Sequence, residues 1–420
     1  MAYSRFPRLN VATLLLSLLL FPRRSAAATP EILYSFSSGG DGSYPSGVIA
    51  GSSGVLYGAT CNGGTSDSGA VYSLAAPQDG SGSPWTKSVL YSFAGGSDGG
   101  CPDTLVLGAD GVLYGTTAWA NQTIQTTAFS LTPPQSSGNP WTFTRLYTFT
   151  EVEGTAIGLA TGPDGALYIT TRWGGSGGVG SVESLSPPAA PAGSWRLTVL
   201  HTFNYLEYGA FPLSGVIVGP GGELYGTAQN GGLDGCPTCG VVYTLYPPKS
   251  SGGNWPFKIL YSFTRKAPEP VGIVMGKGGV LYGSLGVGAV FSLAPPAAPG
   301  GAWTEAILYT FSNSGSNDYY YPLIIGREGV LYGTAMLPTV SQTCCGIVYS
   351  LTAPAGSSTG WTETTMYDFG GAPFDGNGPN STLILGKDGT LFGTTSGGGT
   401  FNLGTVYALK PAPRAIVPSS

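Results

Sequence analysis

A repeated Leu-Tyr-Gly tripeptide constrains the fold of this chain more than any other feature. It occurs seven times, as Leu-Tyr-Ile in the third copy and Leu-Phe-Gly in the seventh. The copies start at Leu56, Leu113, Leu167, Leu224, Leu281, Leu331 and Leu391. Their spacing runs from 50 residues (Leu281 to Leu331) to 60 residues (Leu331 to Leu391). A period of this length is typical of one blade of a β-propeller.

Three further segments accompany each tripeptide in a fixed order. In the first copy they are an apolar run before it (47–51), AVYSL after it (70–74), and a stretch from Trp85 to Phe93 that ends in LYSF. Each segment is short, rich in β-branched or aromatic residues and bounded by Gly, Pro or Ser, which predicts a strand. Asp-Gly pairs such as the one at 110–111 predict tight turns between the first two strands. Each copy therefore predicts a four-stranded antiparallel meander.

The apolar residues in these strands are adjacent rather than alternating, as in Val55-Leu56-Tyr57. Both faces of each sheet are then expected to be covered, which radial stacking of blades provides. We predict an all-β fold, a seven-bladed β-propeller of four-stranded antiparallel blades. The seventh copy ends at Leu409 without a Trp-to-Phe strand, and a spare strand precedes the first copy at 31–36. This N-terminal strand is expected to join the last blade and close the ring.

The N-terminal residues predict export. Arg5 and Arg8 precede an apolar run at 11–21, and Ala26 to Ala28 offer a cleavage site, so residues 1–28 are predicted to be a signal peptide. An uncleaved membrane anchor is the alternative. The propeller is expected at 29–410 and a short tail at 411–420, with no transmembrane segment after signal cleavage. We expect a protein that is secreted, periplasmic or on the cell surface.

Only 9% of the residues are charged and the net charge is −5. A nucleic-acid partner is therefore not expected.

The motifs LYSF, DGxLYGTT, GG and GxVFxL, followed from Leu33 to Leu409, resemble those of the exported bacterial proteins with choice-of-anchor GloVer tandem repeats. The resemblance implies an exported protein, often attached to the surface, and implies no catalytic residues. The segment after Leu409 departs from the family because it contains no apolar anchor.

Because successive strands alternate in direction, the loops fall on two rims. The loops between second and third strands share one rim with the connections between blades, and we call it the cysteine-bearing rim. The Asp-Gly turns and the Pro-rich segments before each Trp lie on the opposite side, the turn rim. All six cysteines are predicted on the first rim: Cys61, Cys101, Cys236, Cys239, Cys344 and Cys345. Any site-based function is expected there.

Cysteines of an exported chain are normally oxidised. A disulfide between Cys61 and Cys101 would join two neighbouring rim loops. Cys236 and Cys239 are expected to form a local disulfide, with a redox or metal motif as the alternative. Cys344 and Cys345 permit a vicinal disulfide that either offers a flat surface to a ligand or only stiffens its loop; pairing with other cysteines also stays open.

Aromatic residues outside the shared strand positions are the candidate ligand contacts: Trp119, Trp173, Tyr205, Tyr208 and Tyr320. Exposed aromatic rings can stack on sugars or dock a protein partner. The alternative is that they pack the loops onto the rim.

The sequence predicts no catalytic constellation. His201, the single histidine, occupies a position that is Tyr in the other copies, so triads, His-based metal sites and cofactors are not expected. Six carboxylates are predicted on the rim: Asp103, Glu151, Glu153, Glu183, Glu207 and Asp318. We expect a monomeric, non-catalytic module that binds a glycan or an extracellular protein. The alternatives are an exported glycoside hydrolase or lyase that uses two of these acids, and a purely structural surface protein.

Overall fold

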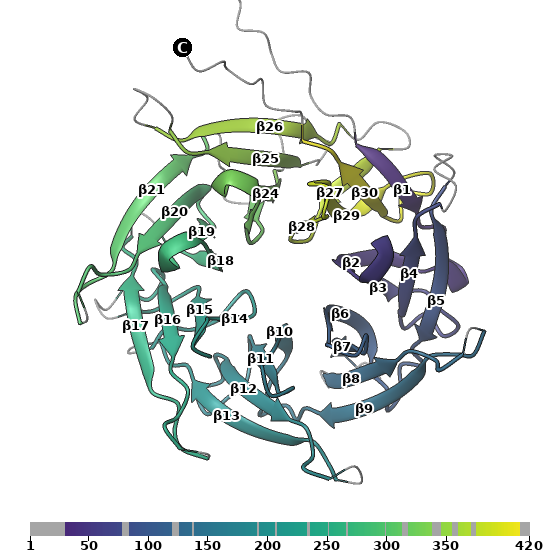
Figure 1. Ribbon diagram of the computed structural model, residues 1–420, viewed down its shortest axis with the longest axis horizontal. Helices are drawn as coiled ribbons and strands as arrows, with labels where there is room; N and C mark the ends of the chain where they lie inside the picture. Colours follow the sequence, from purple (N-terminus) through teal and green to yellow (C-terminus); the bar gives the residue numbers. More distant parts are fainter. Residues whose placement is uncertain are drawn as a thin grey trace, which may run out of the picture.

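The computed structural model shows seven antiparallel sheets arranged as blades around a central axis (Figure 1). It describes residues 30–77, 84–119, 126–136, 138–190, 193–205, 208–232, 236–250, 252–265, 268–298, 300–312, 318–337, 346–354, 360–370 and 375–411. These residues form strands and four short 3-10 turns: η1 (Gly39–Asp41), η2 (Ser52–Gly54), η3 (Lys277–Gly279) and η4 (Arg327–Gly329). The predicted all-β seven-bladed propeller is confirmed.

Each blade runs from an inner strand at the axis to an outer strand at the circumference. The first three blades are β2 (Ser43–Ala50), β3 (Leu56–Asn62), β4 (Ala70–Ala75) and β5 (Thr86–Ser92); β6 (Gly100–Leu107), β7 (Leu113–Trp119), β8 (Thr127–Thr132) and β9 (Thr142–Thr148); and β10 (Ala156–Thr161), β11 (Leu167–Thr171), β12 (Ser181–Ser186) and β13 (Arg196–Thr202). The fourth and fifth are β14 (Ile217–Val218), β15 (Leu224–Ala228), β16 (Val241–Leu245) and β17 (Phe257–Ser262); and β18 (Pro270–Met275), β19 (Leu281–Leu285), β20 (Ala289–Ala294) and β21 (Thr304–Thr310).

The last two blades have divided inner strands. The sixth contains β22 (Tyr319–Tyr320), β23 (Ile324–Ile325), β24 (Leu331–Met336), β25 (Ile347–Thr352) and β26 (Thr362–Asp368). The seventh contains β27 (Gly376–Pro379), β28 (Ile384–Leu385), β29 (Leu391–Gly398), β30 (Thr405–Leu409) and β1 (Glu31–Ser35). The seventh blade thus combines the two ends of the chain.

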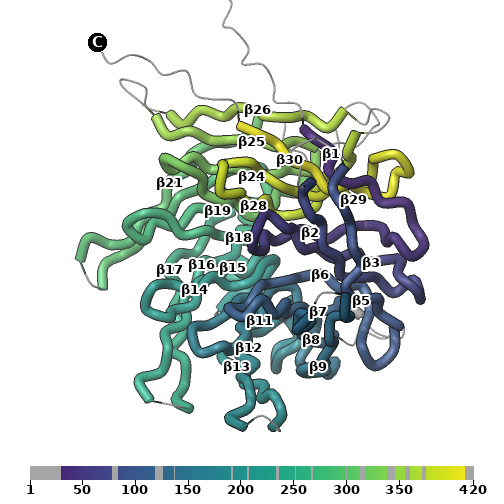
Figure 2. Tube along the Cα trace, turned by 45° about the vertical axis from the view of Figure 1, so that its right-hand side comes forward, coloured from purple at the N-terminus to yellow at the C-terminus, as the bar shows by residue number. Residues whose placement is uncertain are grey.

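The ring is closed as predicted. β1 pairs antiparallel with β30, with Glu31 opposite Ala408 and Ser35 opposite Thr405. The two strands lie side by side in Figure 2, although they come from opposite ends of the sequence. The outer edge of the seventh blade is therefore formed by the start of the chain.

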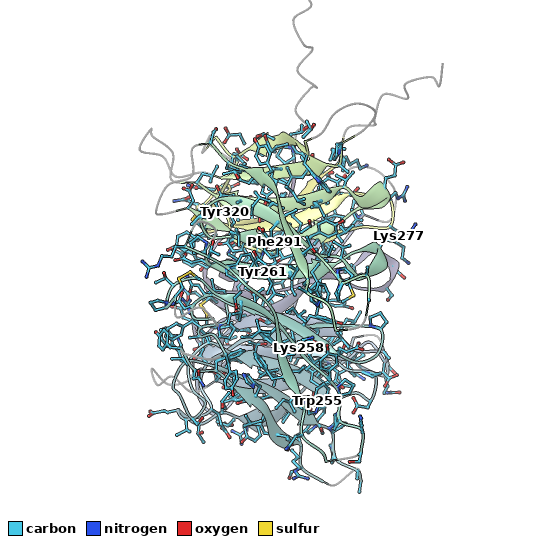
Figure 3. All side chains as sticks on the ribbon, turned by 90° about the vertical axis from the view of Figure 1, so that its left-hand side faces the viewer. Trp255, Lys258, Tyr261, Lys277, Phe291 and Tyr320 are labelled. Atoms are coloured by element: carbon cyan, nitrogen blue, oxygen red, sulfur yellow. A yellow bond between two sulfur atoms is a disulfide. The ribbon has the colours of Figure 1, made fainter. Side chains whose placement is uncertain are left out.

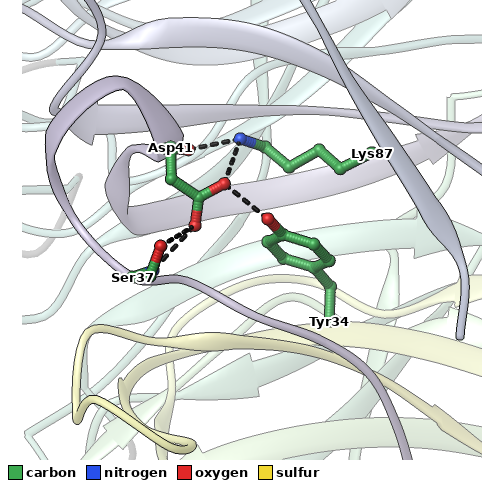
Figure 4. Close-up of polar contacts among 4 residues, drawn as sticks. All are labelled: Tyr34, Ser37, Asp41 and Lys87. Atoms are coloured by element: carbon green, nitrogen blue, oxygen red, sulfur yellow. Dashed lines mark hydrogen bonds and ion pairs between the residues drawn. The ribbon is translucent and has the colours of Figure 1, made fainter.

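A polar cluster joins this closing strand to the first blade (Figure 4). The Tyr34 hydroxyl of β1 donates to Asp41 Oδ1 at 2.5 Å, and Lys87 Nζ of β5 lies 2.9 Å from the same oxygen. The Ser37 backbone N–H and hydroxyl donate to Asp41 Oδ2. Burial alone would raise the pKa of the Asp41 carboxyl, but the hydrogen bonds from Lys87, Tyr34 and Ser37 hold it below its usual value. The cluster stabilises the junction between the last and first blades.

Aromatic pairs fill the interfaces between blades. At six of the seven interfaces, the Phe that ends the fourth strand meets a ring on the third strand of the next blade, as Phe36 meets Tyr72 with centroids 5.3 Å apart. The glycine of the tripeptide makes room for that ring, because a Cβ on Gly58 would lie 2.3 Å from the Tyr72 hydroxyl oxygen. The repeated glycine is therefore a packing requirement. Figure 3 views the ring edge-on, with Phe291 in the fifth blade, Lys277 toward the turn rim and Tyr320 toward the opposite rim.

The third blade departs from this pattern at two linked positions. Glu183 of β12 stands where the other six blades have a Tyr or Phe, and Ile169 of β11 stands where they have the glycine. Both residues are fully buried. The shorter glutamate leaves space that the isoleucine side chain fills, so the two substitutions compensate each other in volume.

Candidate functional site

A left-handed backbone conformation recurs in four blades on the cysteine-bearing rim. Tyr44, Cys101, Phe211 and Glu269 each precede a proline at the entry to the inner strand, and all four have left-handed φ values between 52° and 67°. Each donates its backbone N–H to a carbonyl of the preceding blade. The bonds are Tyr44 to Leu403 (3.0 Å), Cys101 to Ser68 (2.8 Å), Phe211 to Val179 (2.9 Å) and Glu269 to Cys239 (3.1 Å). The blades are thus joined to each other at the rim by main-chain bonds.

The proline that follows fits against a glycine of the preceding blade. A Cβ on Gly180 would lie 2.8 Å from Pro212 Cδ, and one on Gly69 would lie 2.6 Å from Pro102 Cδ. Left-handed backbone is costly for non-glycine residues, yet here it recurs at the same place with four different side chains. The scaffold therefore fixes the backbone and leaves the side chain free to vary, so these are positions where the rim can present different chemistry.

Three aromatic side chains form a contiguous surface where the third and fourth blades meet, which we call the aromatic platform. Trp173 is 50% exposed and Tyr205 is 42% exposed. Phe211 lies between them, with its ring centroid 4.7 Å from that of Trp173 and 5.3 Å from that of Tyr205. The Arg172 guanidinium lies 5.5 Å from the Trp173 ring centroid. Two of the predicted ligand candidates therefore belong to one exposed patch.

Tyr208 lies nearby but packs in a different group. Its ring meets His201 edge-on at 5.3 Å, and His201 stacks on Phe257 with centroids 3.8 Å apart. Burial lowers the pKa of His201 to about 4, so the imidazole is neutral at physiological pH. His201 is a packing residue in this arrangement, as its Tyr-equivalent strand position predicted.

The remaining aromatic candidates have different outcomes. Tyr320 is only 2% exposed because it pairs in β22 and packs against Phe311, so its prediction as a rim ligand contact is corrected. Its neighbour Tyr319 is 64% exposed. The side chain of Trp119 lies outside the described residues. Tyr44 is 47% exposed but is not among the candidates predicted from the sequence. Its Tyr-Pro dipeptide at the entry to an inner strand nevertheless matches Phe211-Pro212.

The structure contains two of the expected disulfides. Cys61 at the end of β3 bonds to Cys101 at the start of β6, which ties the first blade to the second. Cys236 bonds to Cys239 within the loop between β15 and β16. Cys344 and Cys345 lie outside the described residues, so their vicinal pairing stays a prediction.

Several rim acids have a structural role. The Tyr of the LYSF motif donates to a carboxylate in the following loop in four places: Tyr34 to Asp41, Tyr91 to Asp98 (3.1 Å), Tyr147 to Glu153 (2.7 Å) and Tyr367 to Asp375 (2.9 Å). Glu153 also accepts the Thr150 backbone N–H at 2.7 Å. These carboxylates fix the loops between blades. Glu151 is exposed, and Glu207 lies outside the described residues.

Two of the predicted rim carboxylates lie elsewhere. Glu183 sits in the blade interface with no exposed surface, accepts the Ser181 hydroxyl at 2.9 Å, and has a second oxygen without a partner among the described residues. Burial and the nearby Glu153 raise its pKa to about 7, although the Ser181 bond opposes the shift. Asp103 lines the central channel. A fully buried Glu183 cannot reach a substrate on the rim, which removes it from any glycosidase pair there.

Comparison with known proteins identifies the family. The model of the Gloeobacter/Verrucomicrobia repeat matches residues 19–189 and 142–335, which together span most of the chain. The chain belongs to this repeat family. Among proteins of curated function, none matches it.

Solved structures support the fold of this repeat protein. The extracellular domain of a putative hybrid two-component system from B. thetaiotaomicron aligns over 90% of the chain, with 12% identity and a TM-score of 0.52; the chain spans only 39% of that structure. A periplasmic gluconolactonase from Pseudomonas aeruginosa aligns over 82% of the chain and 95% of its own length, with 15% identity and a TM-score of 0.53. At these identities the likeness shows the propeller architecture alone.

Two features are absent from the described ranges. No cluster of three or more His, Cys, Asp or Glu side chains there could hold a metal ion. The same residues include no helix of the length and apolarity that a membrane crossing requires.

Proposed function

We propose that this member of the repeat family is an extracellular, non-catalytic propeller that binds a glycan on its cysteine-bearing rim. The observation that carries the proposal is the aromatic platform of Trp173, Tyr205 and Phe211. Aromatic side chains half-exposed at a loop surface are unfavourable to leave in water and are suited to stacking on the apolar face of a sugar ring.

The backbone geometry at Phe211 supports a role for the aromatic platform in binding. Its backbone is fixed by the bond to Val179 and by Pro212 on Gly180, so the ring needs little ordering when a ligand binds. The same position holds Tyr44 in the first blade and Glu269 in the fifth. The fold accepts an aromatic or a charged side chain at this position, so it does not itself require Phe211.

An extracellular location has independent support. The disulfides Cys61–Cys101 and Cys236–Cys239 favour an oxidising compartment. One structural neighbour is an extracellular domain and another is a periplasmic enzyme. The low charge content matches a surface that meets neutral polymers rather than nucleic acid.

The test is binding of a defined panel, namely cellohexaose, xylohexaose, mannohexaose and chitohexaose, measured by isothermal titration calorimetry. Trp173→Ala is expected to weaken the binding of the best oligosaccharide about tenfold, since the lost stacking corresponds to about 1.4 kcal/mol. The melting temperature should stay nearly unchanged because Trp173 is half in solvent.

A matched control is available on the opposite rim. Tyr246, in the turn between β16 and β17, is 38% exposed, and Tyr246→Ala should leave binding intact. Equal losses in the two variants, or no binding of any oligosaccharide, would contradict the proposal. Chromatography of the oligosaccharides after incubation distinguishes binding from turnover, and shortened products would favour the enzyme alternative.

A further inference from the structure

The innermost strands of all seven blades enclose a central channel with a volume of about 570 Å³. Bulges at the start of the inner strand interrupt the regular pairing in four blades, for example between Pro45 and Gly47 and between Pro102 and Leu105. A bulge of this kind re-aims a side chain. The unpaired residues are Ser46 in the first blade and Asp103 and Thr104 in the second, and all three line the channel.

Among the described residues, Asp103 is the only charged side chain that lines the channel. The third, fourth, sixth and seventh blades place Ile157, Ser214, Tyr321 and Ser381 at the corresponding points of the lining. The carboxylate is accessible to the channel, but the ring encloses it, and this enclosure raises the pKa of Asp103. No hydrogen bond or ion pair reaches it from the described residues. The Ser46 hydroxyl, in the neighbouring blade, is also without a partner in that part of the chain.

The side chains that line the channel change from polar to apolar along its axis. Ile49, Ile217 and Val274 line the channel three positions further along their strands, about 10 Å toward the turn rim at the usual rise per residue. One end of the channel is therefore polar with a single uncompensated carboxylate, and the rest is apolar. The Asp103 side chain is exposed to the channel and has no partner among the described residues, so a cation that enters the channel can pair with it.

We propose that the central channel is a binding site for a small organic ammonium ion, whose charged group pairs with Asp103 and whose carbon chain extends along Ile49, Ile217 and Val274. A divalent metal ion fits this lining less well. Calcium prefers six to eight oxygen ligands, several of them carboxylate, and the channel offers one carboxylate. This site is separate from the aromatic platform and does not depend on it.

The proposal is tested with hexylammonium as the probe and hexan-1-ol as the neutral compound of the same length, both titrated into the full chain and followed by calorimetry. Hexylammonium is expected to bind, and hexan-1-ol at least tenfold more weakly. Asp103→Asn should weaken hexylammonium binding at least tenfold. Asp110→Asn makes the same substitution on an exposed residue of the adjoining turn and should leave binding unchanged.

A measurement of the melting temperature shows whether the Asp103→Asn variant is folded. Asp103→Asn is expected to keep the melting temperature at pH 7, because the side chain is exposed to the channel and no hydrogen bond or ion pair reaches it from the described residues. Trp173→Ala should not alter hexylammonium binding, which separates this site from the platform. Equal binding of the alcohol, unchanged binding to Asp103→Asn, no binding at all, or calcium ions displacing the probe would each overturn the proposal.

Discussion

The interface between the first and second blades and the interface between the second and third use the same backbone for opposite chemistry. At the first, Phe93 meets Phe129 at 5.2 Å, and Phe143 stacks on Tyr91 at 4.4 Å. At the second, Glu183 replaces the central ring. The first interface is a buried aromatic stack, whereas the second contains the titratable carboxyl group of Glu183. The repeat therefore tolerates a buried acid where the adjacent strand supplies compensating volume.

The largest expected effect comes from moving the acid into the aromatic interface. Phe129→Glu removes a fully buried ring and introduces a carboxylate without a partner, which should lower the free energy of unfolding by about 4 kcal/mol or more. Urea denaturation measures the change.

A second substitution in the same blade tests whether the isoleucine compensates for the volume lost with the aromatic ring. Gly115→Ile alone should destabilise the protein, because even a Cβ there would lie 2.4 Å from Phe129 Cζ. In the Phe129→Glu background it should instead recover about 1–2 kcal/mol by filling the space. The same effect of Gly115→Ile in both backgrounds would show that Ile169 and Glu183 do not compensate each other.

A smaller effect is expected from neutralising the acid where it naturally occurs. The raised pKa of Glu183, about 7, means that the folded state keeps a proton that the unfolded chain releases above about 4.5. Stability should therefore fall as the pH rises from 4.5 to 7 and then level off. Glu183→Gln should remove this decline and be more stable than the natural protein by about 3 kcal/mol at pH 8.

The control for this prediction is the low-pH limit. At pH 4 both proteins carry a neutral side chain at position 183, so their unfolding free energies should agree. A constant difference between the two proteins across the range from pH 4 to pH 8 would argue that Glu183 does not titrate in the folded state.

The smallest effect is expected at the junction between the last and first blades, where Lys87 occupies the strand position of Phe143. Its ammonium lies about 5.5 Å from the rings of Tyr34 and Tyr72 and pairs with Asp41. Lys87→Met keeps the aliphatic packing and should cost about 1–2 kcal/mol at pH 7. Since the folded-state pKa of Asp41 is lowered, the difference should shrink as the pH falls below 3.8. Chemical denaturation at pH 7 and pH 3 checks both statements, and a loss that does not depend on pH would contradict them.

The repeat explains why so much of the fold was predictable. The seven tripeptides and the spare segment at 31–36 determine the blade count and the closing pair, because each strand recurs with the same neighbours. The rim position of Trp173 and Tyr205 followed from their absence in other copies. Their shared contact with Phe211 did not, since it depends on two loops far apart in sequence.

Two errors in the predicted site have physical causes, and a third was avoidable. Tyr320 lies in a run of three tyrosines, and local sequence does not tell which of them turns inward. Asp103 points into the channel because of a bulge, which shifts the alternation that a strand pattern assumes. Glu183 was placed on the rim although the alignment of 182–185 with the other third strands already located it at the aromatic position. That signal was present in the sequence.

The pairing of β1 with β30 also determines when the ring of blades can close during folding. Because Glu31 is matched with Ala408, the first strand to leave the ribosome has no partner until nearly the whole chain has followed. Contacts between such distant residues form slowly, and unpaired strand edges are where chains associate wrongly. The ring cannot close before β30 has been synthesised, and until closure the nascent molecule presents two unpaired strand edges to its neighbours.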